Sequence, residues 1–228
     1  MPPTGNQPSL RKIGILEVQG AFQEHKVALM KAKACLDVII ELEVMEVRHP
    51  DHLVSDMDGL IIPGGESTTI SLFLKRNKME EPLRTWIQTK GHAVWGTCAG
   101  MILLSKFTEN QKDGGQPTLG MLDTVVSRNF FGRQVHSFEA QVTIKSPSLS
   151  TSGTECHGVF IRAPAVLKTT SSEVTVLAVL ERTEQKDSVI VAVQQGDVMA
   201  TAFHPELTED LRWHVYFLTM IENAKMQT

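Results

Sequence analysis

A cysteine set between small residues is the first feature of this sequence that could do chemistry. In GTCAG, residues 96–100, Cys98 stands between Gly96 and Gly100 and follows the apolar run HAVW. The spacing is the cysteine version of the G-x-S-x-G nucleophile elbow, a sharp turn from a strand into a helix. The N-terminal N–H groups of such a helix would favour the reactive thiolate. The alternative is a buried structural cysteine, because free cysteine is among the most buried residue types.

A nucleophilic thiol needs a base, and AFHPEL, residues 202–207, offers one. In an extended segment, residues two apart project to the same side, so His204 and Glu206 would face one way. His204 could then approach Cys98, while Glu206 orients the imidazole and stabilises the imidazolium. The commoner meaning of a histidine and a glutamate at this spacing is an ordinary surface pair.

The third feature is IIPGGEST, residues 61–68, in which an apolar run ends in a glycine turn. Acyl transfer needs backbone N–H groups aimed at the developing oxyanion. The turn at Gly64 and Gly65 can supply one, since no side chain obstructs approach, and Ala99 would supply the other. Taken by itself, the stretch is a plain strand-to-helix turn, with Ser67 or Thr68 as the helix cap.

Apolar periodicity predicts the elements that would position these residues. Strands are expected over residues 13–18, 37–47, 57–62 and 92–96, and helices over 21–36, from 66 onward, and over 82–90. This alternation is typical of a parallel sheet with helices on its faces. The second half adds strand-like runs over 121–129, 137–145, 158–161, 174–180, 188–194 and 198–203, and a last helix over 209–225. We expect a disordered arm over residues 1–12 and one domain over 13–225.

The amino-acid composition limits the classes of protein to which this sequence can belong. Apolar residues make up 42% of the 228, charged residues 21%, and the net charge is −4. This is an ordinary globular balance without the basic excess that would indicate a nucleic acid or an anionic membrane as partner. Three cysteines at unrelated spacings and a start without an apolar signal region favour a reducing, cytoplasmic setting. His49 and His52 have no further ligand nearby, so no metal site is expected.

PGGEST, GTCAG and HPE, in this order, resemble the class I glutamine amidotransferases, which carry a Cys-His-Glu triad on an α/β sheet. LEVQGAFQEH, RNFFGRQ followed by SFEA, and GVFIRAP are similar to the glutaminase subunits of the two-component pyridoxal 5′-phosphate synthase. The resemblance spans residues 16–207. It implies a flavodoxin-like three-layer sandwich, with a mainly parallel sheet, helices on both faces, and antiparallel strands added in the second half.

The resemblance also implies roles for residues. Cys98 would be the nucleophile, His204 the general base and acid, and Glu206 its partner. Gln19 matches a glutamine near the active site and the partner interface of that family. The implied oxyanion hole is formed by Gly64, Gly65 and Ala99. The implied glutamine-binding residues are Gly65, Glu66, Ser67, Arg128, Ile161 and Arg162.

The implied reaction is hydrolysis of L-glutamine to L-glutamate and ammonia through a glutamyl thioester. Ammonia would pass to a synthase subunit that makes the vitamin B6 cofactor, within a large multi-subunit complex. The glutaminase subunit would itself hold no cofactor. Glu17 and Val18 depart from the small or apolar residues usual in the family before Gln19, which leaves the detail of that strand open.

Two rival readings use the same residues. A glutaminase serving another synthase, in histidine, purine or aminobenzoate biosynthesis, would share the triad but not RNFFGRQ, SFEA and FIRAP together. A non-catalytic amidotransferase-like subunit would have no need for Cys98, His204 and Glu206 together. His214 lies close to HPEL in sequence, and we expect it to be a packing or surface residue with at most an indirect part in the site.

Overall fold

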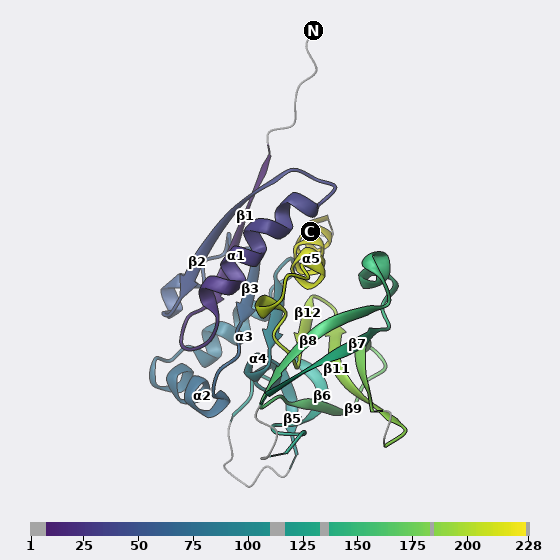
Figure 1. Cartoon of the computed structure of the whole chain (residues 1–228). Helices are drawn as coiled ribbons and strands as arrows, with labels where there is room; N and C mark the ends of the chain where they lie inside the picture. Colours follow the sequence, from purple (N-terminus) through teal and green to yellow (C-terminus); the bar gives the residue numbers. More distant parts are fainter. Residues whose placement is uncertain (1–7, 110–116, 133–136, 183–184, 227–228) are drawn as a thin grey trace.

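The first half of the chain alternates strands and helices, as the periodicity predicts (Figure 1). The structure is a computed structural model that describes residues 8–109, 117–132, 137–182 and 185–226. The elements of this half are β1 (Ser9–Leu16), α1 (Phe22–Ala32), η1 (Lys33–Cys35), β2 (Ile40–Val47), η2 (Pro50–His52), β3 (Gly59–Ile62), α2 (Ser67–Arg76), α3 (Glu80–Gln88), β4 (Ala93–Thr97) and α4 (Ala99–Leu104).

The second half is mostly strands and ends in a long helix. Two strands, β5 and β9, were not predicted, and β5 follows α4 with no turn residue between them. The elements are β5 (Ser105–Thr108), β6 (Leu122–Ser127), β7 (Ser137–Ile144), η3 (Pro147–Ser152), β8 (Glu155–Ile161), β9 (Ala165–Thr169), β10 (Thr175–Arg182), β11 (Asp187–Gln195), β12 (Val198–Thr201), η4 (Pro205–Leu207) and α5 (Arg212–Met226).

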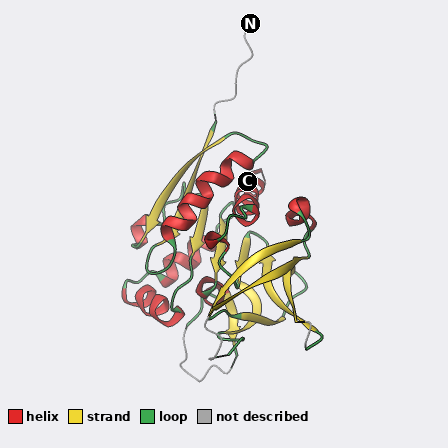
Figure 2. Ribbon diagram, viewed as in Figure 1, coloured by secondary structure: helices red, strands yellow, loops and turns green. Residues whose placement is uncertain are grey.

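The strands of both halves join in one mixed sheet. β2, β1, β3, β4 and β12 lie side by side in that order and run parallel. β11, β10, β7 and β8 continue the sheet with antiparallel pairing, while β9 pairs with β11 and leads to β6 and β5. Figure 2 shows the helices gathered around the parallel strands. The predicted α/β sheet, parallel with antiparallel strands added in the second half, is confirmed.

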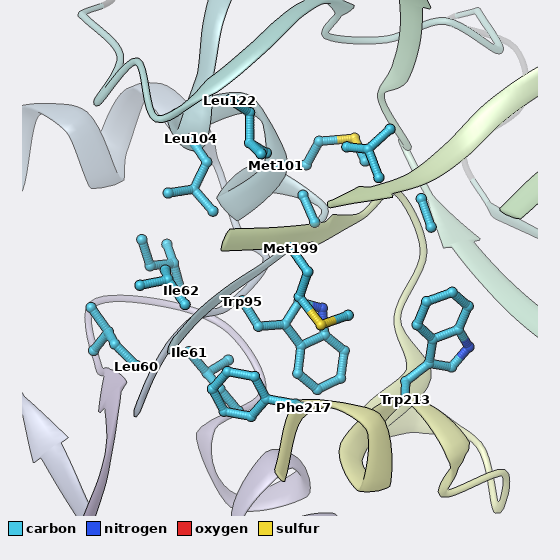
Figure 3. Packing of buried hydrophobic residues seen from close by; sticks show 14 of the residues in the cluster. Leu60, Ile61, Ile62, Trp95, Met101, Leu104, Leu122, Met199, Trp213 and Phe217 are labelled. Carbon is cyan, nitrogen blue, oxygen red and sulfur yellow. The ribbon is translucent and has the colours of Figure 1, made fainter. Parts of the chain in front are cut away.

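Helices cover both faces of the parallel strands, and two neighbouring residues of β4 demonstrate it. Consecutive residues of a strand point to opposite faces. The Trp95 ring contacts Phe217 of α5, with ring centroids 5.7 Å apart. A Cβ at Gly96 would come within 2.7 Å of Leu104 of α4. Figure 3 shows Trp95 packed toward α5, with Met101 and Leu104 on the other side of the strands. The expected three layers are therefore present around β4.

Two sequence predictions at element ends are wrong. The disordered arm was expected to reach residue 12, but β1 begins at Ser9 and pairs in parallel with Ile40 at the start of β2. Residues 1–7 of that arm lie outside the described residues. The cap of α2 is Glu66, whose side chain accepts a hydrogen bond from the Thr69 N–H, and neither Ser67 nor Thr68 takes this position. The ionised carboxylate accepts a hydrogen bond from an N–H group that has no partner within the helix. Its negative charge is also stabilised by the positive end of the helix dipole.

Gly100 in α4 allows the helix to lie against the end of β3. A Cβ at this position would overlap the backbone carbonyl oxygen of Ile62, which belongs to the sheet and cannot move aside. We predict that Gly100→Ala destabilises the fold by about 3 kcal/mol or more. The midpoint of thermal unfolding, measured by circular dichroism, should fall by roughly 6 to 12 °C.

Gly132→Ala is the matched control for this substitution. Gly132 has a φ of +88° but no atom within 4 Å of the added Cβ, so only backbone strain of about 1 kcal/mol is added. A Gly100→Ala protein that melts no lower than Gly132→Ala would contradict the close packing of α4 on β3.

Candidate active site

Cys98 lies on a strained turn between β4 and α4. Its φ of 48° and ψ of −102° are unusual for a residue with a side chain, and backbone strain of this kind clusters at functional sites. The Cys98 N–H donates a 2.8 Å hydrogen bond to the Thr201 carbonyl, which ties the turn to β12. A Cβ at Gly96 would come within 2.5 Å of the Gly100 carbonyl carbon, so the helix can fold back this tightly only on glycine. The strand, turn and helix expected around Cys98 are all present.

His204 and Glu206 reach the same place because β12 runs beside β4. The two strands pair in parallel as far as Thr201 and Thr97, so their carboxyl ends adjoin. His204 is then fixed by its own N–H, which donates to the Val159 carbonyl at 2.9 Å. The extended conformation expected from His204 to Glu206 is wrong, because η4 is a 3-10 helix. The pair forms nevertheless, with His204 Nδ1 2.8 Å from Glu206 Oε1.

The imidazole of His204 and the thiol of Cys98 meet above Gly64. A Cβ at Gly64 would overlap His204 Cε1 and lie 3.4 Å from the Cys98 Cβ, so this position must be glycine for the two side chains to meet. Cys98 and His204 both lie against Gly64, and Glu206 Oε1 lies beside the Nδ1 atom of the His204 ring. The three predicted catalytic residues therefore form one chain of contacts.

The electrostatic interactions among Cys98, His204 and Glu206 favour a charged imidazole on His204. Burial lowers the pKa of His204, but hydrogen bonds to Cys98 and Glu206 outweigh it and raise the pKa to about 10. Burial raises the pKa of Glu206, but the neighbouring His25 and the hydrogen bond from His204 outweigh that effect and lower it below its usual value. An imidazolium beside a cysteine stabilises the thiolate, which is the nucleophilic form.

The sulfur opens into a cavity of about 620 Å³, a size typical of small-molecule sites. The carbonyl of Ile161 lies 3.7 Å from Cys98 Sγ, at the edge of this cavity. Asn129 and Ile102, which the sequence analysis did not single out, also contribute to the wall. The residues that line it are Gly65, Glu66, Ser67, Cys98, Ala99, Ile102, Arg128, Asn129, Ile161, Arg162 and His204.

Arg128 and the start of α2 form a polar side of the cavity. Arg128 Nη2 donates to Ser67 Oγ at 3.1 Å and to Thr68 Oγ1 at 2.9 Å, and it lies 3.4 Å from Glu66 Oε1. Burial opposes the charge of Glu66, but N–H groups of Thr69 and Thr68 and the charge of Arg128 lower its pKa. The cavity thus presents a cation and an anion side by side. Arg133 and Gln134 of the same motif lie outside the described residues.

Gln19 holds the glycine turn at the mouth of the cavity. Its side-chain oxygen accepts a 3.0 Å hydrogen bond from the Glu66 N–H, and a Cβ at Gly65 would lie 2.9 Å from the Gln19 Cβ. Gly65 has a φ of +137°, which a residue with a side chain would rarely adopt. Of the three residues expected to form an oxyanion hole, Gly65 and Ala99 line the cavity with Cys98, and Gly64 lies beneath His204.

His25 and His214 lie behind His204 and Glu206, and the sequence analysis missed the first and left the second as a packing or surface residue. His214 is a packing residue, fully buried, and its Nε2 lies 3.1 Å from His25 Nδ1. His25 Nε2 in turn lies 3.5 Å from Glu206 Oε2. The available signal was the position of His25 on the buried stripe of its helix, between Phe22 and Leu29, where an uncharged residue is usual.

Comparisons with known proteins give the family of the chain. The model of the SNO glutamine amidotransferase family matches residues 15–223. The chain belongs to this family. The resemblance found in its motifs is confirmed, and with it the prediction that the chain is a glutamine amidotransferase. No helix among the described residues of this amidotransferase is long and apolar enough to cross a membrane.

Curated relatives and solved structures extend this result. The amidotransferase is 42% identical to the probable pyridoxal 5′-phosphate synthase subunit PDX2 of Arabidopsis thaliana, over 93% of this chain and 87% of that one. It is 42% identical to the pyridoxal 5′-phosphate synthase subunit PdxT of Listeria monocytogenes, over 93% of this chain and all of that one. A crystal structure of a glutamine amidotransferase matches with a TM-score of 0.75 and 41% identity, over 92% of this chain and 98% of that one. A glutamine amidotransferase of Thermotoga maritima, 15% identical with a TM-score of 0.55 over 96% and 87% of the two chains, shares the fold.

The contact between His204 and Cys98 predicts a reactive thiol. Cys156 is as buried as Cys98, at 3% against 6% exposed, but burial raises the pKa of the Cys156 thiol. Iodoacetamide at pH 7 should therefore alkylate Cys98 at least about tenfold faster than Cys156. His204→Asn should remove most of this difference. Peptide mass spectrometry over a time course measures both rates, and equal rates in the unaltered protein would contradict the predicted thiolate.

Proposed function

We propose that this amidotransferase hydrolyses L-glutamine to L-glutamate and ammonia and delivers the ammonia to the synthase subunit of pyridoxal 5′-phosphate synthase. The observation that carries the proposal is the contact chain from Cys98 through His204 to Glu206, with its sulfur open to a polar cavity. The names of the curated relatives, which are pyridoxal 5′-phosphate synthase subunits, support the pathway.

The proposed reaction is acyl transfer in two steps. The Cys98 thiolate attacks the side-chain amide carbon of glutamine, and a C–S bond forms. His204 gives its proton to the departing nitrogen, the C–N bond breaks, and ammonia leaves a glutamyl thioester. His204 then takes a proton from water, the resulting hydroxide attacks the thioester, and the C–S bond breaks to release glutamate. Glu206 stays ionised and holds the ring of His204 throughout.

Backbone groups would stabilise the oxyanion that forms in both steps. Ala99 is the first residue of α4, so its N–H has no partner within the helix. This N–H lies at the positive end of the helix dipole. Gly65 would supply the second N–H and Gly64 the flexible peptide before it. Gln19 would set the geometry of this turn through its hydrogen bond to the Glu66 N–H. Its position also fits a role in sensing the partner subunit.

The charged side of the cavity suits the amino-acid end of glutamine. The α-carboxylate needs a cation, which Arg128 or Arg162 would provide, and the α-ammonium needs Glu66 or a carbonyl such as that of Ile161. Ser67, hydrogen-bonded to Arg128, would keep the guanidinium in place. Only the side-chain amide would then reach Cys98, which would favour glutamine over simple amides.

Release of free ammonia would waste the product, so the proposal includes a synthase subunit that receives it, as part of a large multi-subunit complex. Three free cysteines, Cys35, Cys98 and Cys156, fit a reducing cytoplasmic location for such a complex. The reaction needs neither a metal nor a cofactor on this chain, because cysteine and histidine supply the nucleophile and the proton transfers.

Glutamate release from glutamine tests the function directly. We predict hydrolysis by this chain that rises when the synthase subunit is added. Cys98→Ala should lower it by at least about a thousandfold, because Cys98 is the only cysteine among the described residues that line the cavity and the only one beside His204. Stimulation by a different synthase and not by this one would favour the rival glutaminase. No activity with any synthase would favour the non-catalytic subunit.

Arg128→Gln tests the assignment of the substrate site. Loss of a charge-assisted contact to the substrate carboxylate should raise KM for glutamine by about tenfold or more, with a smaller change in kcat. Lys145→Gln removes an exposed positive charge that pairs with Glu181 outside the cavity and is the matched control. Equal KM values for the two variants would contradict the role of Arg128.

A further inference from the structure

One oxygen of the Glu206 carboxylate makes no contact with the other two residues of the proposed triad. Glu206 Oε1 takes the hydrogen bond from His204, but Oε2 is fully buried and has no hydrogen-bond partner among the described residues. It lies 3.5 Å from His25 Nε2, and this atom is also buried and without a hydrogen bond among the described residues. A buried carboxylate oxygen without a donor is costly, so two unpartnered atoms facing each other call for an explanation.

His25 is itself held from behind. Its Nδ1 lies 3.1 Å from Nε2 of His214, and both rings lie edge-on to Trp95, with centroids 5.4 and 4.8 Å from the indole. His25 comes from α1 and His214 from α5, two helices that pack together on this face of the sheet. Neither side chain is exposed to solvent. The ring of His25 is therefore fixed in orientation with Nε2 toward Glu206.

The charges decide which nitrogens carry protons. If Nε2 of His25 were unprotonated, its lone pair would face the lone pairs of a carboxylate, which repels. With the proton on Nε2, the Nδ1 atom becomes an acceptor, and His214 donates to it from Nε2. The N–H groups of the three histidines then all point toward Glu206. His214 donates to His25, His25 faces Oε2, and His204 donates to Oε1. Hydrogen bonds aligned in this way strengthen one another.

Both histidines act as neutral donors and not as cations. Burial lowers the pKa of His25 against the opposing effect of Glu206, and burial and the nearby His25 place the pKa of His214 well below its ordinary value. His25 thus supports the carboxylate through an N–H group. The other titratable groups that act on His25 are His204 and Glu24. Lys31 and Glu209 line a groove beside α1 that also reaches Glu206.

We propose that His25, oriented by His214, is a positioning residue for the reaction, donating its Nε2–H to Oε2 of Glu206. Closing the 3.5 Å gap to hydrogen-bond distance needs a shift of about half an ångström. The contact keeps Glu206 ionised and turns Oε1 toward His204, so the catalytic unit extends over five side chains. The inference rests on the proposed function for its effect on turnover, but the contact itself affects the reactivity of Cys98 without substrate.

Two substitutions of similar polarity separate the roles of the two ring nitrogens. The amide of His25→Gln reaches the position of Nε2 and can still donate to Glu206. The amide of His25→Asn reaches only the position of Nδ1 and leaves Oε2 without a donor. His25→Gln keeps a polar group toward Glu206 and His25→Asn keeps one toward His214, so each variant retains one of the two contacts of the ring. His92→Asn is the matched control, since His92 is a buried histidine at the opposite end of β4 that bonds the Trp86 carbonyl.

We expect His25→Asn to lower kcat for glutamine by roughly tenfold to a hundredfold, the value of a hydrogen bond to a charged group, with little change in KM. The acid limb of kcat/KM should move to higher pH, because an unsupported Glu206 is protonated more easily and holds the imidazolium less well. The pH dependence of Cys98 alkylation by iodoacetamide should move in the same direction. His25→Gln should restore both profiles, and His92→Asn should change neither. Rates are taken per active site, titrated with a diazo-ketone analogue of glutamine.

The two readouts keep this inference separate from the proposed function. If the unaltered protein hydrolyses no glutamine with any synthase, the proposed function fails, and the alkylation profiles still decide the role of His25. Alkylation profiles of His25→Asn and His25→Gln that coincide with that of the unaltered protein would overturn the inference. A shift of equal size in His92→Asn would overturn it as well, because it would reduce the effect to a general loss of stability.

Discussion

The parallel pairing of β4 with β12 is the constraint on which the rest of the site depends. These strands are about a hundred residues apart in sequence, yet their registered pairing ends at Thr97 and Thr201, directly before the segments that carry Cys98 and His204. Side chains at the carboxyl ends of adjacent parallel strands lie close together, which is where open α/β sheets place their ligands. The Cys98 N–H bond to Thr201 then locks the cysteine turn to the neighbouring strand.

The site also depends on holding charge where water is excluded. Glu206 is fully buried, and an isolated carboxylate there would be neutralised by proton uptake. The structure meets this cost with histidines from two elements, His204 on one oxygen and His25 facing the other. The energy of the carboxylate is thereby coupled to the imidazolium and, through it, to the sulfur. Packing of α1 and α5 on the sheet is part of the electrostatics of the thiol, because these helices deliver His25 and His214.

Local sequence was sufficient for some of these features and insufficient for others. The turn at Cys98 was predictable because its steric demand selects glycine at 96 and 100, and the apolar strand signal before it is local. The pairing of His204 with Glu206 was found for a partly wrong reason, since η4 is not extended. β5 was missed because it follows α4 with no residue between them, so no local signal separates the strand from the helix. His25 was missed because its meaning comes from Glu206, 181 positions away, and no local pattern encodes that contact.

α1 and α5 meet behind Glu206, and this arrangement has a consequence for the order of synthesis. A ribosome delivers Cys98 long before β12, and α5 emerges after both. Until β12 has inserted beside β4, the cysteine has no imidazole neighbour, and until α5 has docked, His25 has no fixed orientation. A nascent chain would therefore carry an ordinary thiol and destroy no glutamine. A reactive thiol would therefore form only after β12 and α5 have been synthesised and have packed, so the order of the elements along the chain would delay the chemistry until the site is assembled.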